Sequence, residues 1–464
     1  MAVRKEKILI PFSFPLIIIF FTYPFVFAQP VLNLKKVPLF GDTTEEVLFT
    51  ISTEKPETLV YEVFFGDGEV YRSSFVSGEI EVGHQYKKPG VYWLKVAGHS
   101  KKGFTAVESL AIEIKERLAL FEIPLPSATI STPALDENDN LYLGLEDNAL
   151  ISFRKDGAFR FSFSTRNSVY ATPIVFRDKV IFGALDSTLY CLDTTGKLLW
   201  QFSAGSEIYQ PAATDGERIF FVTDDGQLFS LSLGGKLLWK KKVASEPSPV
   251  TIDEKGQIFL TADGIYSFTR DGKMLFSWQT PNEDPFLTGC QLSPDGYLLA
   301  GCEDGFLYAL NKKGELLWKA ATPEEDPIRC EGVFRGDTFL FGADDGVLYK
   351  KGRYGGLIPF FTTDDEIIAS PVVTEDGRVF LFSDDGYLYS LREDGQLLFR
   401  KEIAYSEKGF FITPSLTLTR DGILLATSWD ERIFAFPAGR VHSPHLWHTY
   451  RGVFSREGRV KTRK

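Results

Sequence analysis

Histidine is scarce in this chain and absent from most of its length. The five histidines are His84, His99, His442, His445 and His448. None lies between Arg117 and Arg440, which removes histidine acid–base catalysis and imidazole metal ligands from that segment. The Gly-x-Ser-x-Gly, P-loop and Cys-x-x-Cys motifs are missing as well. We therefore expect neither an enzyme active site nor a metal site there.

Long hydrophobic runs are missing beyond the N-terminal end. Only Ile8 to Phe27 is apolar over nearly enough residues to cross a bilayer, and it follows a short basic start. We predict that residues 1–28 are a signal peptide, cleaved after Ala28. An uncleaved anchor is the alternative, although three prolines weaken a continuous helix there. The mature protein is then expected to be secreted or periplasmic, with no membrane span and no lipid-bearing cysteine.

Composition and charge restrict the partners. The chain is 44% hydrophobic and 14% aromatic, which suffices for a large core. Its formal net charge is −11, so nucleic acid and anionic membrane surfaces are disfavoured as general partners.

A hairpin pattern recurs along most of the chain. Between Asp186 and Phe202, an alternating strand, a Gly turn and a second strand ending in aromatics follow one another. The residue that marks each copy is Ile151, Tyr190, Phe229, Tyr266, Tyr308, Tyr349, Tyr389 and Phe434. A period of about 40 residues, with about four short strands per copy, is typical of β-propeller blades.

One copy lacks its last strand. Seven copies are followed by a Leu-Leu-Trp type strand, and the eighth, which ends at Phe436, is not. The segment from Arg117 to Ile123 matches the missing strand. We predict that it completes the last blade and closes an eight-bladed propeller over residues 116–440, because closure leaves only short, protected sheet edges.

The repeats resemble the pyrroloquinoline-quinone (PQQ)-like propeller family, from about Arg117 to Arg459. The family includes quinoprotein dehydrogenases and the non-enzymatic propeller lipoprotein of outer-membrane β-barrel assembly, so the resemblance implies a fold but not a function. Quinoprotein dehydrogenases hold the quinone between a Trp and a disulfide of adjacent cysteines, and no two cysteines are adjacent here. We expect no cofactor and no enzyme. The resemblance also implies that a tail, residues 441–464, crosses one propeller face and buries Trp447.

Two groups of residues invite a metal hypothesis. The Asp-Asp-Gly turns, such as Asp224 to Gly226, could supply oxygen ligands to calcium, but they sit at one repeat position on separate blades, and turn geometry explains them. The three C-terminal histidines would share a helix face, but Pro444 interrupts them. We predict no metal site in either.

The four cysteines are Cys191, Cys290, Cys302 and Cys330. They are too few for a disulfide framework. Aligned repeats place Cys290 opposite Glu331, one residue from Cys330. A Cys290–Cys330 disulfide is one alternative, and four buried thiols acting as small hydrophobic groups are the other.

Residues 29–115 do not share the repeat. They alternate as strands, and they carry Gly66-Asp67-Gly68, then His84-Gln85-Tyr86, then Pro89-Gly90-Val91-Tyr92. These motifs, in this order, resemble a polycystic-kidney-disease (PKD) domain. The resemblance implies an Ig-like β-sandwich that acts as a spacer or interaction module. Asp67 and His84 are expected to serve turn and core hydrogen bonding.

The sequence thus predicts an exported, all-β, non-enzymatic scaffold that binds a protein partner in the cell envelope or at the cell surface, with a carbohydrate-binding protein or a quinone- or calcium-dependent enzyme as alternatives. The binding face is expected on the loops that lead from one blade to the next, because aromatic and Arg residues are favoured at interaction hot spots. The alternative is that these residues only pack against neighbouring loops or the tail. The candidate residues are Arg166, Tyr170, Glu207, Tyr209, Asp284, Phe286, Arg329, Asp365, Glu366, Tyr405 and Phe410.

Overall fold

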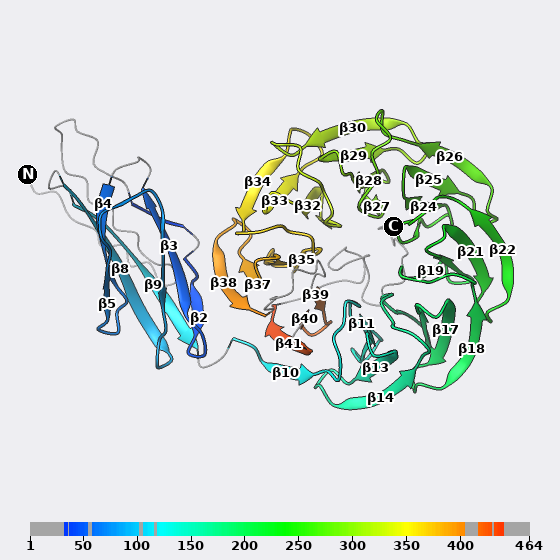
Figure 1. Ribbon diagram of the computed structural model, residues 1–464, viewed down its shortest axis with the longest axis horizontal. Helices are drawn as coiled ribbons and strands as arrows, with labels where there is room; N and C mark the ends of the chain where they lie inside the picture. The colour runs from blue at the N-terminus through cyan, green and yellow to red at the C-terminus, as the bar shows by residue number, and fades with distance from the viewer. Residues whose placement is uncertain are drawn as a thin grey trace, which may run out of the picture.

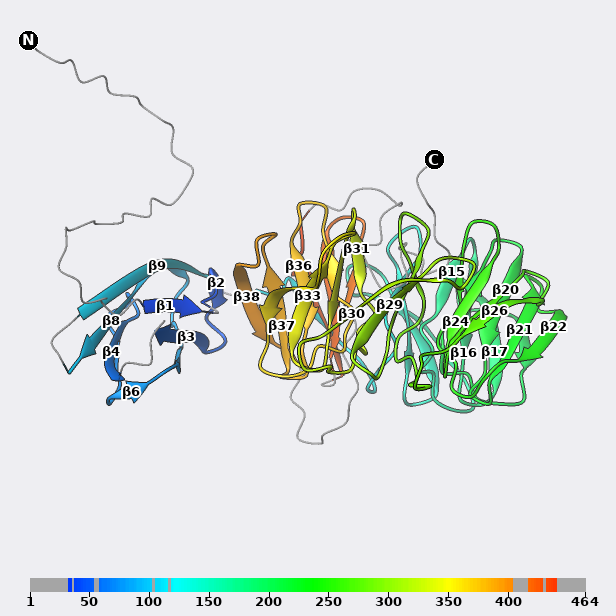
Figure 2. The same cartoon turned by 90° about the horizontal axis from the view of Figure 1, so that it is seen from above.

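The computed structural model describes residues 32–35, 37–53, 58–101, 105–115, 118–403, 416–428 and 431–439. The elements formed by these residues are β-strands, without an α-helix among them. A small N-terminal domain lies beside the rim of a ring of sheets (Figure 1; Figure 2). The predicted signal peptide, the C-terminal tail and the candidate residues Tyr405 and Phe410 lie outside the described residues. In the part of the chain that is described, no helix is long and apolar enough to cross a membrane.

The N-terminal domain consists of two sheets around one core. The first has the order β1-β3-β7, and the second has the order β2-β9-β8-β4-β5, with β6 paired to β4. The strands are β1 (Leu32–Lys35), β2 (Phe40–Asp42), β3 (Val47–Thr53), β4 (Thr58–Phe64), β5 (Val70–Arg72), β6 (Val76–Ser77), β7 (Ile80–His84), β8 (Gly90–Ser100) and β9 (Thr105–Lys115). Alternate residues of both sheets, such as Phe49 and Leu94, fill the shared core, as the period-2 pattern requires.

Asp67 and His84 have structural partners in this domain. His84 is buried, its ring stacks on Phe65 at 3.9 Å between centroids, and its Nε2 lies 2.7 Å from Asp67 Oδ2. The Tyr86 hydroxyl donates to the Phe65 carbonyl at 3.0 Å. The residues of the Gly-Asp-Gly and His-x-Tyr motifs therefore hold the β4–β5 turn against the core, as the sequence predicts.

The described residues after the N-terminal domain form eight four-stranded sheets, arranged as a ring (Figure 1). The first four sheets are β11 (Ala134–Leu135), β12 (Leu141–Leu145), β13 (Ala149–Phe153) and β14 (Phe159–Ser164); β15 (Ile174–Phe176), β16 (Lys179–Gly183), β17 (Thr188–Asp193) and β18 (Leu198–Ser203); β19 (Ala213–Thr214), β20 (Arg218–Val222), β21 (Gln227–Ser232) and β22 (Leu237–Lys242); and β23 (Thr251–Ile252), β24 (Ile258–Thr261), β25 (Ile265–Phe268) and β26 (Met274–Trp278).

The remaining four sheets are β27 (Gln291–Leu292), β28 (Leu298–Gly301), β29 (Phe306–Leu310) and β30 (Leu316–Ala321); β31 (Val333–Arg335), β32 (Thr338–Gly342), β33 (Val347–Lys351) and β34 (Ile358–Thr362); β35 (Val372–Val373), β36 (Val379–Phe382), β37 (Tyr387–Leu391) and β38 (Leu397–Glu402); and β39 (Leu416–Leu418), β40 (Ile423–Ser428) and β41 (Arg432–Pro437), to which β10 (Phe121–Pro124) is added.

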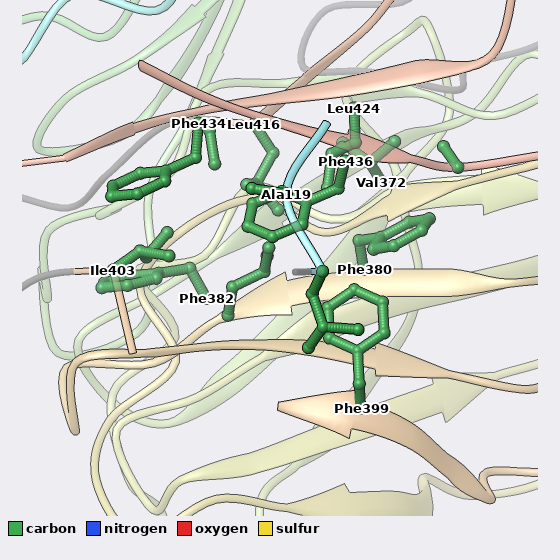
Figure 3. Close-up of a cluster of buried hydrophobic side chains, with 14 of the residues drawn as sticks. Ala119, Val372, Phe380, Phe382, Phe399, Ile403, Leu416, Leu424, Phe434 and Phe436 are labelled. Carbon is green, nitrogen blue, oxygen red and sulfur yellow. The ribbon is translucent and has the colours of Figure 1, made fainter. Parts of the chain in front are cut away.

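The ring is closed by the strand that precedes it. β10 pairs antiparallel with β41, with Phe121 opposite Ala435 and Pro124 opposite Arg432. This confirms the predicted pairing of the N-terminal strand with the last sheet. The strand begins later than predicted, however, because Leu118 and Ala119 are buried in a hydrophobic cluster instead (Figure 3).

The repeat has a side-chain explanation. Where the third strand of a sheet carries Tyr, its hydroxyl donates to the Asp of the preceding turn: Tyr190 to Asp186 at 2.6 Å and Tyr308 to Asp304 at 2.6 Å, for example. The Gly residues of the acidic turns, such as Gly305 and Gly386, have φ values of 76° and 88°, where a side chain would be strained. Acidic residue, Gly and Tyr therefore recur together because they make one turn.

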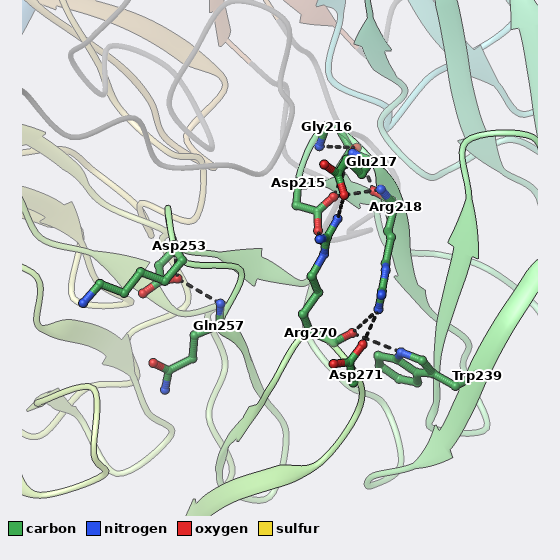
Figure 4. A network of polar contacts seen from close by, with 11 residues as sticks. Asp215, Gly216, Glu217, Arg218, Trp239, Asp253, Gln257, Arg270 and Asp271 are labelled. Atoms are coloured by element: carbon green, nitrogen blue, oxygen red, sulfur yellow. Dashed lines mark hydrogen bonds and ion pairs between the residues drawn. The ribbon is translucent and has the colours of Figure 1, made fainter.

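A second contact joins neighbouring sheets. Trp239 on β22 donates from Nε1 to the Arg270 carbonyl of the next sheet at 3.1 Å, and its ring lies on Gly272 (Figure 4). Arg218 donates to the same carbonyl at 2.9 Å, and Arg270 forms an ion pair with Asp215 at 2.5 Å. The outer strand β22 is thus fixed to the next sheet by its aromatic ring, and charged groups at the β19–β20 turn of the same sheet add to this contact.

The N-terminal domain is attached to the outer strand of the seventh sheet, β38. Leu39 and Phe40 pack against the hydrophobic cluster that contains Leu398 and Phe399 (Figure 3 shows this cluster). Beside this apolar contact, Lys401 Nζ lies 3.3 Å from Asp42 Oδ2 and also forms an ion pair with Glu45. The contact therefore combines an apolar centre with a charged pair.

Candidate binding face

A cavity of about 480 Å³ opens at the centre of the ring, and all eight sheets contribute to it. Most of its wall is formed just before the innermost strand of each sheet, several of which are labelled around the centre of Figure 1. The lining residues are Ile130, Thr132, Tyr170, Thr172, Tyr209, Gln210, Pro211, Glu246, Ser248, Pro249, Phe286, Leu287, Gly289, Arg329, Glu331, Ile368, Ala369, Ser370 and Leu416. Four of the candidate residues therefore share one cavity: Tyr170, Tyr209, Phe286 and Arg329.

Tyr170 and Tyr209 form a pair at the cavity wall. Their ring centroids lie 6.3 Å apart, and they come from the loops before β15 and β19. The Tyr209 hydroxyl donates to Glu207 Oε2 at 2.7 Å, and this hydrogen bond, with burial, raises the pKa of Tyr209 to about 12. Both rings stay neutral at ordinary pH. They offer apolar faces with polar ends, as binding anchors in proteins do.

Arg329 adds a cation to the same wall. Its Nε lies 2.8 Å from Asp344 Oδ2, and its side chain remains exposed while Asp344 is largely buried. Arg329 therefore keeps donors available to a ligand while Asp344 fixes its orientation. An Arg held in this way loses little side-chain entropy on binding.

Phe286 lines the cavity but belongs to the core. It is 6% exposed, and its ring packs against Tyr308 at 5.7 Å and Trp278 at 6.2 Å. This burial leaves little of the ring for a partner to contact. An isolated antiparallel β-bridge pairs the backbone of Phe286 with that of Cys302 and holds the Phe286 loop at the sheet edge, which explains the burial.

The other described candidates do not line the cavity. Arg166 and Asp365 are exposed, whereas Glu207, Asp284 and Glu366 are half-buried. Their loops are held by local hydrogen bonds, such as that from the Arg166 N–H to Asp186 Oδ2 at 3.0 Å.

Asp365 and Glu366 are part of an acidic group with Asp344 and Asp384. Burial, and then repulsion from Glu366 and the neighbouring aspartates, raises the pKa of Asp384 to about 6.

Sequence reasoning missed a set of polar residues around the cavity. In five sheets, the residue just before a Pro that opens the first strand lines the wall: Thr132, Thr172, Gln210, Ser248 and Ser370. Glu331 precedes Gly332, which takes the place of that Pro before β31, and it also lines the wall. The prolines could have indicated these positions, because each Pro restricts the backbone just before the innermost strand of its sheet, next to the central cavity.

Glu331 is the buried acid of this wall. It is 8% exposed, and it accepts hydrogen bonds from the Gly289 N–H at 3.1 Å and from Gln291 Nε2 at 2.9 Å. Gln291 lies on β27 of the neighbouring sheet, and Gly289 lies in the loop just before it. Glu331 therefore serves to join two sheets at the cavity as well as to line it.

The cysteines are buried thiols, not a Cys290–Cys330 disulfide. The Cys330 Sγ lies 3.2 Å from the Ala369 carbonyl oxygen, with which it makes a hydrogen bond.

The described residues contain no group of three or more His, Cys, Asp or Glu side chains that could hold a metal ion. In two Asp-Asp-Gly turns the second Asp accepts a Tyr hydroxyl instead: Asp345 from Tyr349, and Asp385 from Tyr389.

Comparison with known proteins places this ring among solved propellers. A family model described as outer membrane protein assembly factor BamB matches residues 186–333. The crystal structure of BamB from Moraxella catarrhalis superposes with a TM-score of 0.57 at 15% identity, over 69% of this chain and 99% of that one. The ring thus has a β-propeller fold like that of BamB, and residues 186–333 match the BamB family model.

Two other solved structures share the fold. The computationally designed Ika8 protein matches with a TM-score of 0.59 at 17% identity, over 69% of this chain and all of its own. Sqt1 of Saccharomyces cerevisiae matches with a TM-score of 0.58 at 14% identity, over 70% and 100% of the two chains. At such identities the likeness concerns the fold alone. Among curated proteins, none matches this sequence.

Proposed function

We propose that this protein is an exported, non-enzymatic scaffold of the cell envelope, and that the face around the central cavity binds a protein partner. The observation that carries the proposal is the grouping of Tyr170, Tyr209 and Arg329 at one cavity wall. Aromatic and Arg side chains held in place at the edge of a concave site are the residue types that dominate protein-binding energy. The matched family model, whose description names an assembly factor of the outer membrane, supports an envelope role.

The rest of the chain fits this role. In our proposal the ring is an eight-bladed propeller, the N-terminal domain is a PKD-type β-sandwich, and residues 1–28 direct export. The two-sheet core around Phe49 and Leu94 supports the sandwich, and the eight four-stranded sheets support the blade number. The domain lies at the rim, so it can act as a spacer while the cavity face stays accessible to a partner (Figure 2).

A pull-down from envelope extract tests the proposal. The wild-type protein is expected to recover one defined partner, and the variant Y170A/Y209A/R329A is expected to lose it. The matched control is R353A/Y354A, which removes two exposed residues near β34 that do not line the cavity. Equal recovery by all three proteins would exclude the cavity face, and no specific recovery by the wild type would count against the scaffold itself.

The absence of catalysis is part of the proposal and needs its own test. The buried acids described here have structural partners: Asp42 binds Lys401, and Glu331 binds Gly289 and Gln291. Purified protein is expected to carry neither quinone nor stoichiometric calcium by absorption spectroscopy and elemental analysis. A bound quinone would instead favour the enzyme alternative.

A second candidate is glycan binding by the N-terminal domain. Val91 and Trp93 are exposed large side chains on β8, and they are two residues apart on one face of the sheet. An exposed Trp on a flat sheet can stack on a sugar ring through its apolar surface. A glycan array with wild type and W93A separates this candidate from the scaffold, because only glycan binding requires Trp93.

A further inference from the structure

Four of the eight outer strands of the ring, β18, β22, β26 and β30, expose a pair of neighbouring large apolar residues. On β22 these are Leu237 and Leu238, with exposed fractions of 40% and 44%. The same positions are exposed on β18, β26 and β30. They therefore form apolar spots around the rim, and repeat structure alone places them there.

The outer strand β38 also carries an apolar pair but does not expose it. On β38 the equivalent residues, Leu397 and Leu398, are 4% and 6% exposed. Leu398 lies in the hydrophobic cluster against which Leu39 and Phe40 of the N-terminal domain pack, whereas Leu397 is buried in a separate cluster with Val333 of the sixth sheet. The chain itself thus shows what this strand type binds when it is covered.

The charges at this contact are complementary. Arg400 and Lys401 follow the apolar residues of β38 and are buried. Lys401 forms ion pairs with Asp42 and Glu45, and Arg400 Nη2 lies 3.2 Å from Glu81 Oε2. Lys401 is therefore paired with carboxylates of the segment that also supplies Leu39 and Phe40, whereas the partner of Arg400 comes from β7.

β22 repeats the residue order of β38 in the same register. Its sequence is Leu-Leu-Trp-Lys-Lys-Lys, and that of β38 is Leu-Leu-Phe-Arg-Lys-Glu. Trp239 pairs with Ser230 as Phe399 pairs with Ser390, and Lys241 pairs with Leu228 as Lys401 pairs with Leu388. Among the outer strands of the ring, only β22 and β38 carry basic residues at the positions of both Lys240 and Lys241.

β22 is nevertheless uncovered. Leu237, Leu238 and the three lysines are exposed, and no acidic side chain of the described residues forms an ion pair with Lys240, Lys241 or Lys242. Figures 1 and 2 both place β22 across the ring from β38 and from the N-terminal domain. The strand is also rigid, because Trp239 is fixed to the next sheet by its hydrogen bond to Arg270 (Figure 4). A rigid strand pays little entropy on binding.

We propose that β22 is a second docking surface, and that it binds an apolar and acidic segment of a partner protein, with the chemistry that residues 39–45 present to β38. Leu238 would be covered by apolar side chains, as Leu398 is, and Lys241 would pair with carboxylates, as Lys401 does. A second copy of this chain is a poorer occupant, because its own residues 39–45 are already packed on its own β38. This surface is separate from the cavity face, so the docking proposal can be tested independently of the proposed function.

A peptide tests the surface directly. The probe has the sequence of Val37–Val47, with a photoreactive leucine at position 39, and it is irradiated with the full-length protein. We expect mass spectrometry to find crosslinks on Leu237–Lys242, and we expect K240E/K241E to lower their yield about tenfold, as loss of two complementary charges does. The matched control is K319E, which reverses an exposed lysine at the Lys240 position of β30. Circular dichroism checks that the variants are folded.

Variant peptides and light scattering distinguish the proposed partner segment from a simple anion and from a second copy of this chain. A peptide with Asp42→Asn and Glu45→Gln is expected to lose crosslinking, and so is one with Phe40→Ser. Retained crosslinking of the Phe40→Ser peptide would show a mere anion-binding patch, which contradicts the proposal. Equal labelling of β18, β26 and β30, or an unchanged yield in K240E/K241E, would overturn it. A dimer in light scattering that K240E/K241E dissolves would overturn the choice of partner in favour of a second copy.

Discussion

Lys401 Nζ lies 3.3 Å from Asp42 Oδ2, and this ion pair joins the N-terminal domain to the propeller. The Asp42 side chain is 1% exposed and that of Lys401 is 9% exposed. Asp42 also accepts the Leu118 N–H at 3.1 Å. Burial would raise the Asp42 pKa, but the hydrogen bond from Thr44 and the charge of Lys401 hold it below its ordinary value. One carboxylate thus connects the N-terminal domain, the segment before β10 and the outer strand β38.

Replacing Lys401 tests this connection. Lys401→Met leaves Asp42 buried without its cation, so we expect the free energy of unfolding to fall by about 3 kcal/mol. The measurement is urea unfolding followed by circular dichroism. Lys241→Met is the matched control, because Lys241 has the same register on β22 but is exposed; its effect is expected within about 0.5 kcal/mol. Equal effects of the two substitutions would show that the ion pair does not hold the domain.

A pair of glycines tests the contact between neighbouring sheets. Gly235 and Gly205 have φ values of 81° and 90°, so an Ala at either costs about 1 kcal/mol in backbone strain. A Cβ at Gly235 would also lie 2.6 Å from Trp200 Cδ2, whereas one at Gly205 meets nothing within 4 Å. We expect Gly235→Ala to destabilise by about 1–3 kcal/mol more than Gly205→Ala in thermal or urea unfolding. No difference would mean that Trp200 is not held tightly by this turn.

The raised pKa of Asp384 predicts a pH effect with a definite sign. Burial and the carboxylates around it raise its pKa from 3.8 to about 6 in the folded state. The folded state therefore binds a proton more tightly than the unfolded state, and its contribution to stability is lost as pH rises from about 4 to about 6. Asp384→Asn should remove this loss and raise the free energy of unfolding at pH 7 by about 1–3 kcal/mol.

Unfolding of wild type and D384N from pH 4 to pH 8 measures this effect. The two stability curves are expected to converge near pH 4 and to separate above it. Asp224→Asn, at the same turn position of another sheet, is the control and should follow the wild type. A D384N curve parallel to that of the wild type over the whole range would contradict the assignment.

The cysteines make a prediction about reactivity. Burial raises the pKa of Cys191, Cys302 and Cys330 to about 12, so little thiolate forms at pH 8. A thiol reagent such as DTNB is expected to label the native protein hardly at all. After denaturation without reductant, all four thiols should react. Two reactive thiols instead of four would show a disulfide and contradict this prediction.

Sequence reasoning reached the ring because the repeat itself encodes it. In five sheets a Tyr recurs together with the acidic turn residue that accepts its hydroxyl, as Asp304 does from Tyr308. The missing eighth strand was predictable by counting, and β10 fills that place. Local patterns of this kind depend on neighbouring residues, which is why they can be read from the sequence.

Other features depended on contacts that no local pattern contains. Burial of Phe286 follows from Trp278 and Tyr308, and burial of Leu398 follows from a domain that precedes it by about 350 residues of chain. The polar wall with Glu331 was missed because only the prolines, not their neighbours, were read as markers. The exposed strand β22 could be recognised as a candidate docking surface only by comparison with β38, which the N-terminal domain contacts.

The most direct test of the central claim is photocrosslinking from the cavity face in living cells. Tyr209 is replaced by p-benzoylphenylalanine, with Tyr354, which is strongly exposed and outside the cavity, as the control position. The account predicts one discrete crosslinked product from position 209, containing an envelope protein, and none of the same size from position 354. The same product from both positions, or no discrete product from position 209, would contradict a binding site at the cavity.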